Sequence, residues 1–277
     1  MNVRIIPRLD IKGQNLVKGI QFEGLRIIGK PEKYASSYYK LGADELIYMD
    51  IVASLYGRNN LLDIVSRTSK DIFIPLTVGG GLRSIDDISN ALNAGADKVA
   101  LNTAVIKDPD LIKKASRKFG SSTIIVSIEA KKINDNYEAY IDNGREKTGV
   151  NAIDWAIEAE KLGAGEIMIT CVDRDGTGKG FDTNLSNTIS KLLSIPLICG
   201  GGAGSVMHVK ELIKLSSPNA VCIGSLFHYE SMTKKKKDES AFTNPLLMQR
   251  GFTNISPISI KDLKTQLIAE KIKVRSV

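Results

Sequence analysis

The sequence has few of the residues that most often hold metals or form disulfides. It contains three cysteines, Cys171, Cys199 and Cys222, each within an apolar run, and two histidines, His208 and His228. So few and so scattered side chains give neither a disulfide framework nor a metal-ligand spacing. We therefore expect buried cysteines, and neither a metal, a cofactor nor a covalent nucleophile.

Long hydrophobic runs are also missing. No apolar run approaches the roughly 18 residues that a membrane helix needs, and the first residues, "MNVRIIPRLD", lack a secretory apolar segment. We therefore expect a cytoplasmic protein without a membrane partner. Much of the net charge of +7 comes from the run 234–237 and from "KIKVR" near the end. Binding of a phosphorylated small molecule would explain an excess of basic residues around a binding site as well as binding of nucleic acid would. We expect the small molecule as ligand, and no nucleic acid.

Strand-like apolar runs alternate eight times with amphipathic helical runs, as in repeated βα units. Strands are expected at 4–10, 45–51, 73–80, 98–103, 123–130, 166–173, 195–201 and 220–225. Helices are expected at 31–42, 60–70, 84–95, 108–120, 151–163, 184–194, 205–216 and 259–272. The pattern predicts a single (β/α)₈ barrel over residues 1–277, with an insertion at about 230–258 between strand eight and the last helix. An open, doubly wound sheet remains the alternative.

The two halves of the sequence repeat each other. "IPLTVGGG" begins at Ile74 and "IPLICGGGAG" at Ile195, a separation of 195 − 74 = 121 residues. The first glycines of "LGADE" and "LGAGE", Gly42 and Gly163, have the same separation, 163 − 42 = 121. A duplicated half-barrel is the simplest explanation of both repeats.

Carboxylates end the first and fifth predicted strands. Asp10 and Glu129 are 129 − 10 = 119 residues apart, within two residues of the repeat, so we expect them on opposite sides of the barrel mouth. Reactive groups of such barrels lie at the C-terminal ends of strands, and two facing carboxylates suit general acid and base catalysis. Asp50 and Asp175 add acidic groups to the same rim.

Glycine-rich turns follow the third and seventh predicted strands, at 79–81 and 200–204, and each leads into a helix. Open backbone N–H groups at a helix N-terminus form an anion site. Ser225 after the eighth strand, with Asn102 and Thr103 beside the first turn, supplies further donors. One site in each half predicts a substrate with a phosphate at each end.

Charged residues begin four of the predicted strands, at the opposite end of the barrel. They are Arg4, Glu45, Lys98 and Glu166. Two residues of each sign can neutralise one another in a ring across the floor, or they can be four separate solvated strand starts. The residues alone leave both interpretations open.

Taken together, these motifs resemble the cyclase subunit of imidazole glycerol phosphate synthase from histidine biosynthesis. The likeness covers about residues 3–229 and again the last helix. The segments that carry it are "RIIPRLDIKGQNLVKG", "DELIYMDIVAS", "TVGGG", "GADKVALNTA", "GAGEIMITCVDRDGTGKGFD" and "GGAG".

The resemblance implies ammonia delivered through the barrel from a glutaminase subunit docked at the N-terminal face. The substrate implied is a ribulosyl-formimino nucleotide, with Asp10 and Glu129 performing acid and base steps while it is split and the imidazole ring closes. The resemblance also implies that Arg4, Glu45, Lys98 and Glu166 correspond to the residues of the family's ammonia gate. The substrate-binding and phosphate-binding residues implied are Asp50, Gly80, Gly81, Asn102, Thr103, Thr170, Asp175, Gly176, Gly201, Gly202, Gly224 and Ser225.

Three features depart from the family pattern. Glu129 replaces an aspartate, and the added methylene moves the carboxylate by about 1 Å or more, which can cost about 10²-fold in rate. Arg8 replaces a small residue near Asp10. The insertion at about 230–258 is a solvated loop or a lid over the substrate face.

The departures resemble a second branch of the family, found with sugar and lipopolysaccharide biosynthesis. In that branch glutamine-derived ammonia would convert an acetamido sugar to an acetamidino sugar. Two further alternatives are a related phosphate-binding barrel isomerase and an idle barrel that only activates the glutaminase.

Overall fold

Eight parallel strands close into a barrel in the computed structural model, which describes residues 2–53, 61–235 and 254–276. In order around the barrel they are β1 (Arg4–Lys12), β4 (Leu46–Asp50), β5 (Leu76–Gly79), β6 (Lys98–Leu101), β7 (Ile124–Ile133), β10 (Glu166–Cys171), β11 (Leu197–Gly200) and β12 (Ala220–Ile223). Because β12 also pairs in parallel with β1, the ring is complete. The (β/α)₈ barrel is therefore confirmed, and the open sheet is wrong.

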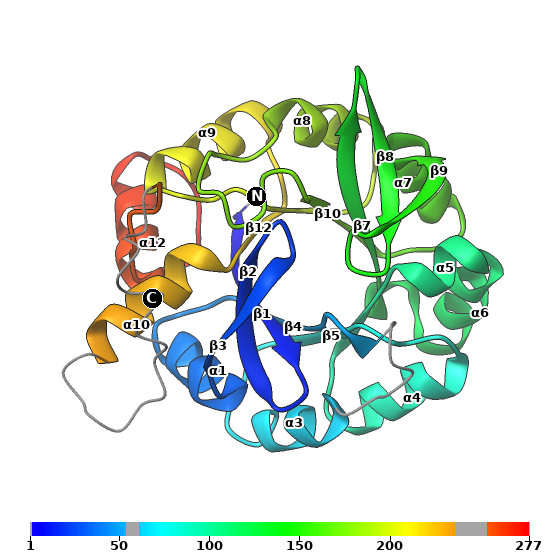
Figure 1. Ribbon diagram of the computed structural model, residues 1–277, viewed down its shortest axis with the longest axis horizontal. Helices are drawn as coiled ribbons and strands as arrows, with labels where there is room; N and C mark the ends of the chain where they lie inside the picture. Colours follow the sequence, from blue (N-terminus) through cyan, green and yellow to red (C-terminus); the bar gives the residue numbers. More distant parts are fainter. Residues whose placement is uncertain (1, 54–60, 236–253, 277) are drawn as a thin grey trace.

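Helices surround the strands on the outside, as Figure 1 shows. They are α1 (Pro31–Lys40), α3 (Leu61–Thr68), α4 (Ile85–Asn93), α5 (Thr103–Lys107), α6 (Asp110–Phe119), α7 (Ala152–Lys161), α8 (Thr183–Leu192), α9 (Val206–Ser216) and α12 (Ile260–Ala269), with a 3₁₀ turn, η1 (Ser121–Thr123). Helix α4 begins with a capping box, in which Ser84 and Asp87 satisfy each other's backbone N–H groups. Ser205 and Ser259 cap α9 and α12 in a similar way, each accepting from a backbone N–H group in the first turn.

Side chains alternate along each strand between the helices and the barrel interior. On β1, Ile5 and Leu9 pack in the core between strands and helices, whereas Ile6 belongs to a separate inner cluster with Ile47 and Met168. Arg4, Arg8 and Asp10 share the face of Ile6, as does Lys12 at the exposed end of β1. The barrel interior therefore has charged groups at its floor and mouth, and apolar side chains between them.

Two antiparallel hairpins extend two of the barrel strands beyond the C-terminal face. The first is β2 (Asn15–Ile20) with β3 (Glu23–Gly29), which continues from β1. The second is β8 (Asn136–Ile141) with β9 (Glu146–Asn151), which continues from β7. In Figure 1 they are the blue and green ribbons that stand in front of the helical ring. They were not predicted, but they follow the first and fifth barrel strands, as a duplicated half-barrel requires.

The chain after β12 forms a helix, α10 (Ser225–Lys235). The start of the predicted insertion, residues 230–235, is therefore the end of a helix and not a loop. Residues 236–253, the greater part of that insertion, lie outside the described residues, as do two lysines of the run 234–237. Within the described chain, no helix is both long enough and apolar enough to cross a membrane.

Candidate functional site

The two predicted catalytic carboxylates both reach the C-terminal mouth and are both buried. Asp10 near the end of β1 is 6% exposed, and Glu129 on β7 is 4% exposed. Glu129 Oε2 accepts a hydrogen bond of 2.7 Å from the backbone N–H of Gly144, in the turn between β8 and β9. The hairpin that the sequence analysis missed therefore helps to fix the Glu129 carboxylate.

Arg8 lies between these carboxylates. Its Nε donates to Asp10 Oδ1 at 2.7 Å, and its Nη1 donates to Thr170 Oγ1 at 3.3 Å. Thr170 on β10 is the register neighbour of Glu129 on β7. Since β10 lies nearly opposite β1 in the ring, the Arg8 side chain crosses the barrel interior. The ring of Phe22, at the turn between β2 and β3, lies 5.1 Å from the guanidinium carbon.

Burial raises the pKa of Glu129 to about 7, because a charged carboxylate is poorly solvated there. The charge of Arg8 and the Gly144 N–H group oppose this increase, and the charge of Asp10 adds to it. A carboxyl group with a pKa near neutrality can both donate and accept a proton under physiological conditions. Burial also raises the pKa of Asp50, although hydrogen bonds from the backbone N–H groups of Val52 and Ala53 oppose the increase.

The first half of the mouth is an open cavity of about 380 Å³. Its lining includes most of the residues predicted for that half, namely Asp50, Gly80, Gly81, Asn102, Thr103 and Glu129. Asn102 donates from Nδ2 to the carbonyl of Tyr140, while its Oδ1 has no hydrogen-bond partner among the described residues. An open, partly unsatisfied polar pocket is suited to a polar ligand.

The second half of the mouth is almost filled by the protein itself. Its cavity measures about 20 Å³, room for about one water molecule, and is lined by Arg8, Asp10, Lys18, Asp175, Gly176, Gly201, Gly202, Gly224 and Ser225. Lys18 reaches into it from β2 and forms a 2.9 Å ion pair with Asp175. We expected Asp10 and Glu129 to face each other across one pocket. They line separate cavities, because the Arg8 guanidinium lies between them.

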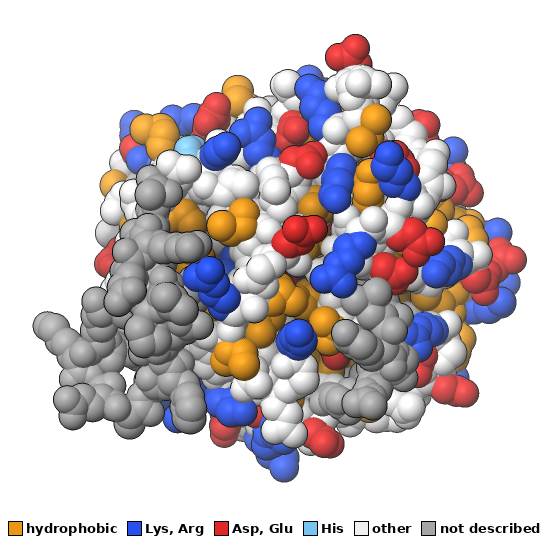
Figure 2. Space-filling model, in the orientation of Figure 1, with side chains coloured by type: hydrophobic (Ala, Val, Ile, Leu, Met, Phe, Trp, Pro, Cys, Tyr) orange, Lys and Arg blue, Asp and Glu red, His pale blue; other side chains and the backbone are white. Residues whose placement is uncertain are grey.

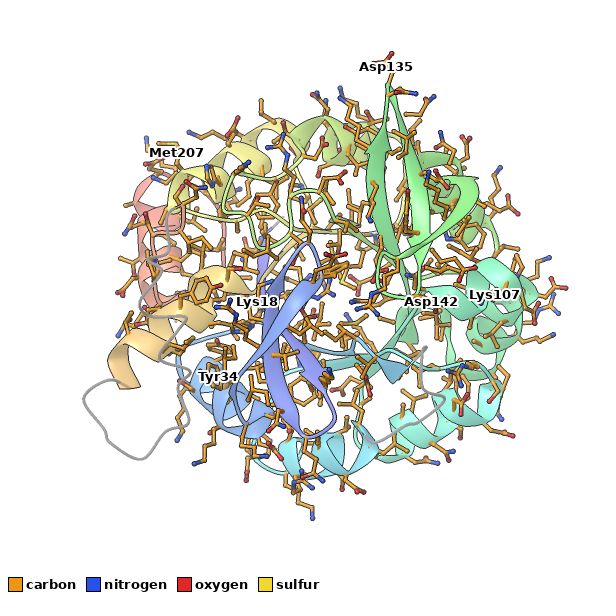
Figure 3. All side chains as sticks on the ribbon, in the orientation of Figure 1. Lys18, Tyr34, Lys107, Asp135, Asp142 and Met207 are labelled. Atoms are coloured by element: carbon orange, nitrogen blue, oxygen red, sulfur yellow. The ribbon has the colours of Figure 1, made fainter. Side chains whose placement is uncertain are left out.

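Charged side chains and the two hairpins surround the mouth of the barrel (Figures 2 and 3). Figure 2 shows Lys and Arg side chains interspersed with Asp and Glu over this face. In Figure 3, Lys18 lies on the β2–β3 hairpin near the centre, and Asp142 lies at the base of the second hairpin. Lys18 and Gly144 were both missed in the sequence analysis. The turn sequence Asp142-Asn143-Gly144 was the signal for the second hairpin.

The two glycine turns are equivalent in space as well as in sequence. A Cβ atom on Gly80 would lie 2.1 Å from the Asp50 carbonyl oxygen, and one on Gly201 would lie 2.6 Å from that of Cys171. The equivalent residues of the two contacts are separated by the length of the repeat, since 201 − 80 = 121 for the glycines and 171 − 50 = 121 for the carbonyl residues. Only glycine fits where each turn presses against the neighbouring strand. Both predicted glycine turns therefore lie at the C-terminal ends of their strands, and their role as anion sites stays a prediction.

At the floor of the barrel, the four charged strand starts form a closed ring. Arg4 donates to Glu45 at 2.6 Å and to Glu166 at 2.5 Å, while Lys98 contacts the same two carboxylates at 3.2 and 2.5 Å. Burial alone would raise the pKa of Glu166, but the bonds from Arg4 and Lys98 lower it. The interpretation as four separate solvated residues is therefore wrong.

The side chains that most often hold metals are scattered or buried in the described part of the chain. Cys171, Cys199 and Cys222 are free and buried, as predicted. Within the described ranges, no group of three His, Cys, Asp or Glu side chains is arranged to hold a metal ion. His228 packs against Tyr34 and Tyr38, and burial lowers its pKa to about 3. It is therefore a neutral core residue.

Comparison with known proteins places this architecture in a family. The family described as "Histidine biosynthesis protein" matches residues 4–233. A Legionella pneumophila protein named "Imidazole glycerol phosphate synthase subunit HisF" is 57% identical over 206 residues, which cover 74% of this chain and 97% of that protein. A Clostridium botulinum protein of the same name is 45% identical over 235 residues, covering 84% of this chain and 93% of that protein.

These names agree with the resemblance drawn from the sequence motifs. Neither relative's name mentions a sugar, a lipopolysaccharide or an isomerase, so those alternatives gain no support. Both names describe a subunit, and hence a protein that works within a complex. On the extent of these matches, the chain belongs to the family of HisF subunits of imidazole glycerol phosphate synthase.

Proposed function

We propose that this chain is a cyclase subunit that uses ammonia from a glutaminase partner to act on a ribulosyl-formimino nucleotide with two phosphates. The products would be imidazole glycerol phosphate and an aminoimidazole carboxamide ribonucleotide. The observation that carries the proposal is the pairing of a charged ring at the floor with two carboxylates at the mouth of one barrel.

The charged ring argues for passage through the barrel. A floor that needed only to be closed would be more stable with apolar side chains, because a buried ion pair rarely repays its desolvation. Among the described residues, Arg4, Glu45, Lys98 and Glu166 bond to one another and to no other side chain, so they form a self-contained seal. Separating one pair would open a polar path toward the inner cluster and the mouth. This arrangement suits a small polar molecule such as ammonia.

The mouth offers the groups that the proposed reaction needs. Glu129, with a pKa of about 7, supplies a proton to the leaving nitrogen and recovers one later. Asp10, held by Arg8, would accept the proton that ammonia loses as it attacks. The glycine turns at 79–81 and 200–204 would bind the two phosphates through backbone N–H groups, one on each side of the reacting atoms.

Exposed apolar residues support docking of the glutaminase at the N-terminal face. Phe73 is 80% exposed in the segment that leads into β5. Leu192, Leu215 and Ile268 are also exposed, and each lies in the last turn of its helix, next to the floor of the barrel. Large exposed apolar side chains are typical of interaction surfaces.

The test is a substrate assay with two nitrogen sources. The purified chain should consume the formimino nucleotide when it is given ammonium salts. With glutamine it should do so only when a HisH-type glutaminase is present. Failure to consume this nucleotide with either source would overturn the proposed acceptor and favour the acetamido-sugar alternative. Turnover of a phosphorylated substrate without ammonia or a partner would favour the isomerase.

A further inference from the structure

We propose that Arg8 is a substrate-binding residue that completes a phosphate site in the second half of the mouth, together with Gly201, Gly202, Gly224 and Ser225. The inference rests on the proposed function, because that function supplies the doubly phosphorylated substrate. It adds a charged side chain to a site that the glycine turn alone would form from backbone groups.

The first step of the argument is an unsatisfied donor. Arg8 is 6% exposed, and its Nη2 has no hydrogen-bond partner among the described residues. Its Nε and Nη1 are engaged by Asp10 and Thr170. A buried N–H of a charged group that lacks an acceptor is costly, by about 1–3 kcal/mol or more. Such a group is expected where a ligand supplies the missing oxygen.

The second step is the position of this donor. The cavity that Arg8 lines is also lined by Gly201 and Gly202, where the β11 turn leaves the backbone bare, and by Gly224 and Ser225 at the start of α10. Helix α10 runs from Ser225 to Lys235, so its first N–H groups point toward this end of the barrel. Bare backbone, a helix N-terminus and a guanidinium together favour a tetrahedral oxyanion.

The third step concerns charge. Around the cavity, Arg8 is paired with Asp10 and Lys18 with Asp175. Each pair is balanced in charge, so a bound phosphate must use N–H groups that the pairs leave free. Arg8 can keep its Nε bond to Asp10 and still donate from Nη2, because the guanidinium has five N–H groups in a fixed plane. Lys18 lines the same cavity and donates to Asp175, and its ammonium has three N–H groups in all.

The small size of the cavity indicates how the site would open. At about 20 Å³ it cannot hold a phosphate as it stands. The β2–β3 hairpin covers it, since Phe22 stacks on Arg8 and the Gln21 N–H donates to the Asp175 carbonyl at 2.8 Å. We expect phosphate to bind as this hairpin lifts, whereas the first half is already open.

The experiment counts binding sites for inorganic phosphate by isothermal titration calorimetry. The wild-type chain should bind two phosphates, and Arg8→Met should bind one, with affinity for the lost site reduced at least about tenfold. Thr103→Val should weaken the other site, so both sites should be weakened in the double variant. Arg117→Met, which removes an exposed arginine on α6, is the matched control and should bind two.

The outcomes separate the two proposals. Two sites in Arg8→Met with unchanged affinities would overturn the role of Arg8 and leave the doubly phosphorylated substrate standing. A wild-type chain that binds phosphate once, with that site intact in Arg8→Met, would overturn both. Circular dichroism checks that Arg8→Met is folded. If it is not, Arg8→Lys decides, and unchanged affinity at both sites in that variant overturns the proposal.

Discussion

At the scale of single residues, the mouth separates two carboxylates that the sequence presents as a matched pair. Asp10 is bound by a guanidinium, whereas Glu129 has a single backbone N–H donor and a pKa raised to about 7 by burial. Neighbouring acidic groups in such different environments take different roles in proton transfer. Burial therefore makes Glu129 a group that can change its protonation state near neutral pH.

Replacing Glu129 by Gln should abolish turnover with ammonium salts, by about 10² fold or more, because the amide can neither donate an acidic proton nor accept one. Steady-state kinetics with the formimino nucleotide measure the loss. Circular dichroism and activation of a glutaminase partner should be unchanged. Turnover at the wild-type rate would contradict a catalytic role and favour a barrel that only activates its partner.

The same substitution should change stability in a pH-dependent way. The folded pKa of Glu129, about 7, lies above its ordinary value of 4.5, so ionisation costs folding free energy. The cost is absent below about pH 4.5, grows between pH 4.5 and 7, and is complete above pH 7, at about 3 kcal/mol. Glu129→Gln should therefore stabilise the protein at pH 8 and have little effect at pH 4.5. Urea unfolding at both values tests this, and an equal shift at both would show that ionisation is not the cause.

At the scale of elements, the last helix is tied to the floor by one buried ion pair. Lys264 of α12 donates to Asp44 Oδ1 at 2.9 Å and to the Gly42 carbonyl at 2.7 Å. Asp44 Oδ2 in turn accepts the Ile5 N–H of β1 at 2.7 Å. The helix that follows the insertion is therefore held to the first barrel strand by side-chain chemistry as well as by apolar packing.

Removing the Lys264–Asp44 ion pair should lower the free energy of unfolding. Lys264→Met leaves the Asp44 carboxylate buried without its cation, which typically destabilises a protein by about 3–5 kcal/mol. Thermal and urea unfolding measure the change. Lys261→Met, an exposed lysine of the same helix, is the control and should change stability by less than about 0.5 kcal/mol. Adding Asp44→Asn to Lys264→Met should recover part of the loss, and no recovery would contradict the ion-pair explanation.

At the scale of the whole molecule, the described barrel has charged side chains at both ends of its interior. The ring of Arg4, Glu45, Lys98 and Glu166 closes the floor, and Arg8 crosses the interior just below the mouth. An inner cluster of apolar side chains lies between them. In the proposed function the two faces perform different tasks, with docking and ammonia entry at the floor and phosphate binding and proton transfer at the mouth.

Lys98→Ala should impair the use of glutamine more than the use of free ammonium, because it breaks two of the four ring contacts while the mouth stays intact. We expect the loss of the glutamine-dependent rate to exceed the ammonium-dependent loss by about fivefold or more. Lys33→Ala, on the outer wall, should affect neither rate. Equal losses with both nitrogen sources would count against the gate.

The sequence by itself determined the elements and much of the site. Alternating strand-like and helical runs predicted the barrel, and the 121-residue repeat together with the strand ends predicted the positions of the glycine turns and the carboxylates. The two hairpins were not predicted, although Asp142-Asn143-Gly144 is a recognisable turn, because the βα pattern left residues 15–29 and 134–150 as connections. The sequence also began the predicted insertion, a loop or a lid, at about residue 230, whereas α10 continues to Lys235.

Only the tertiary structure decided how the charges meet. Arg4, Glu45, Lys98 and Glu166 are spread over 162 residues of sequence, and their closure into a ring depends on strand register around the barrel. Arg8 could have pointed outward or toward solvent as far as its neighbours in sequence show. Its position between Asp10 and Thr170 follows from the closure of β1 opposite β10, because only a closed barrel brings distant strands within reach of one side chain.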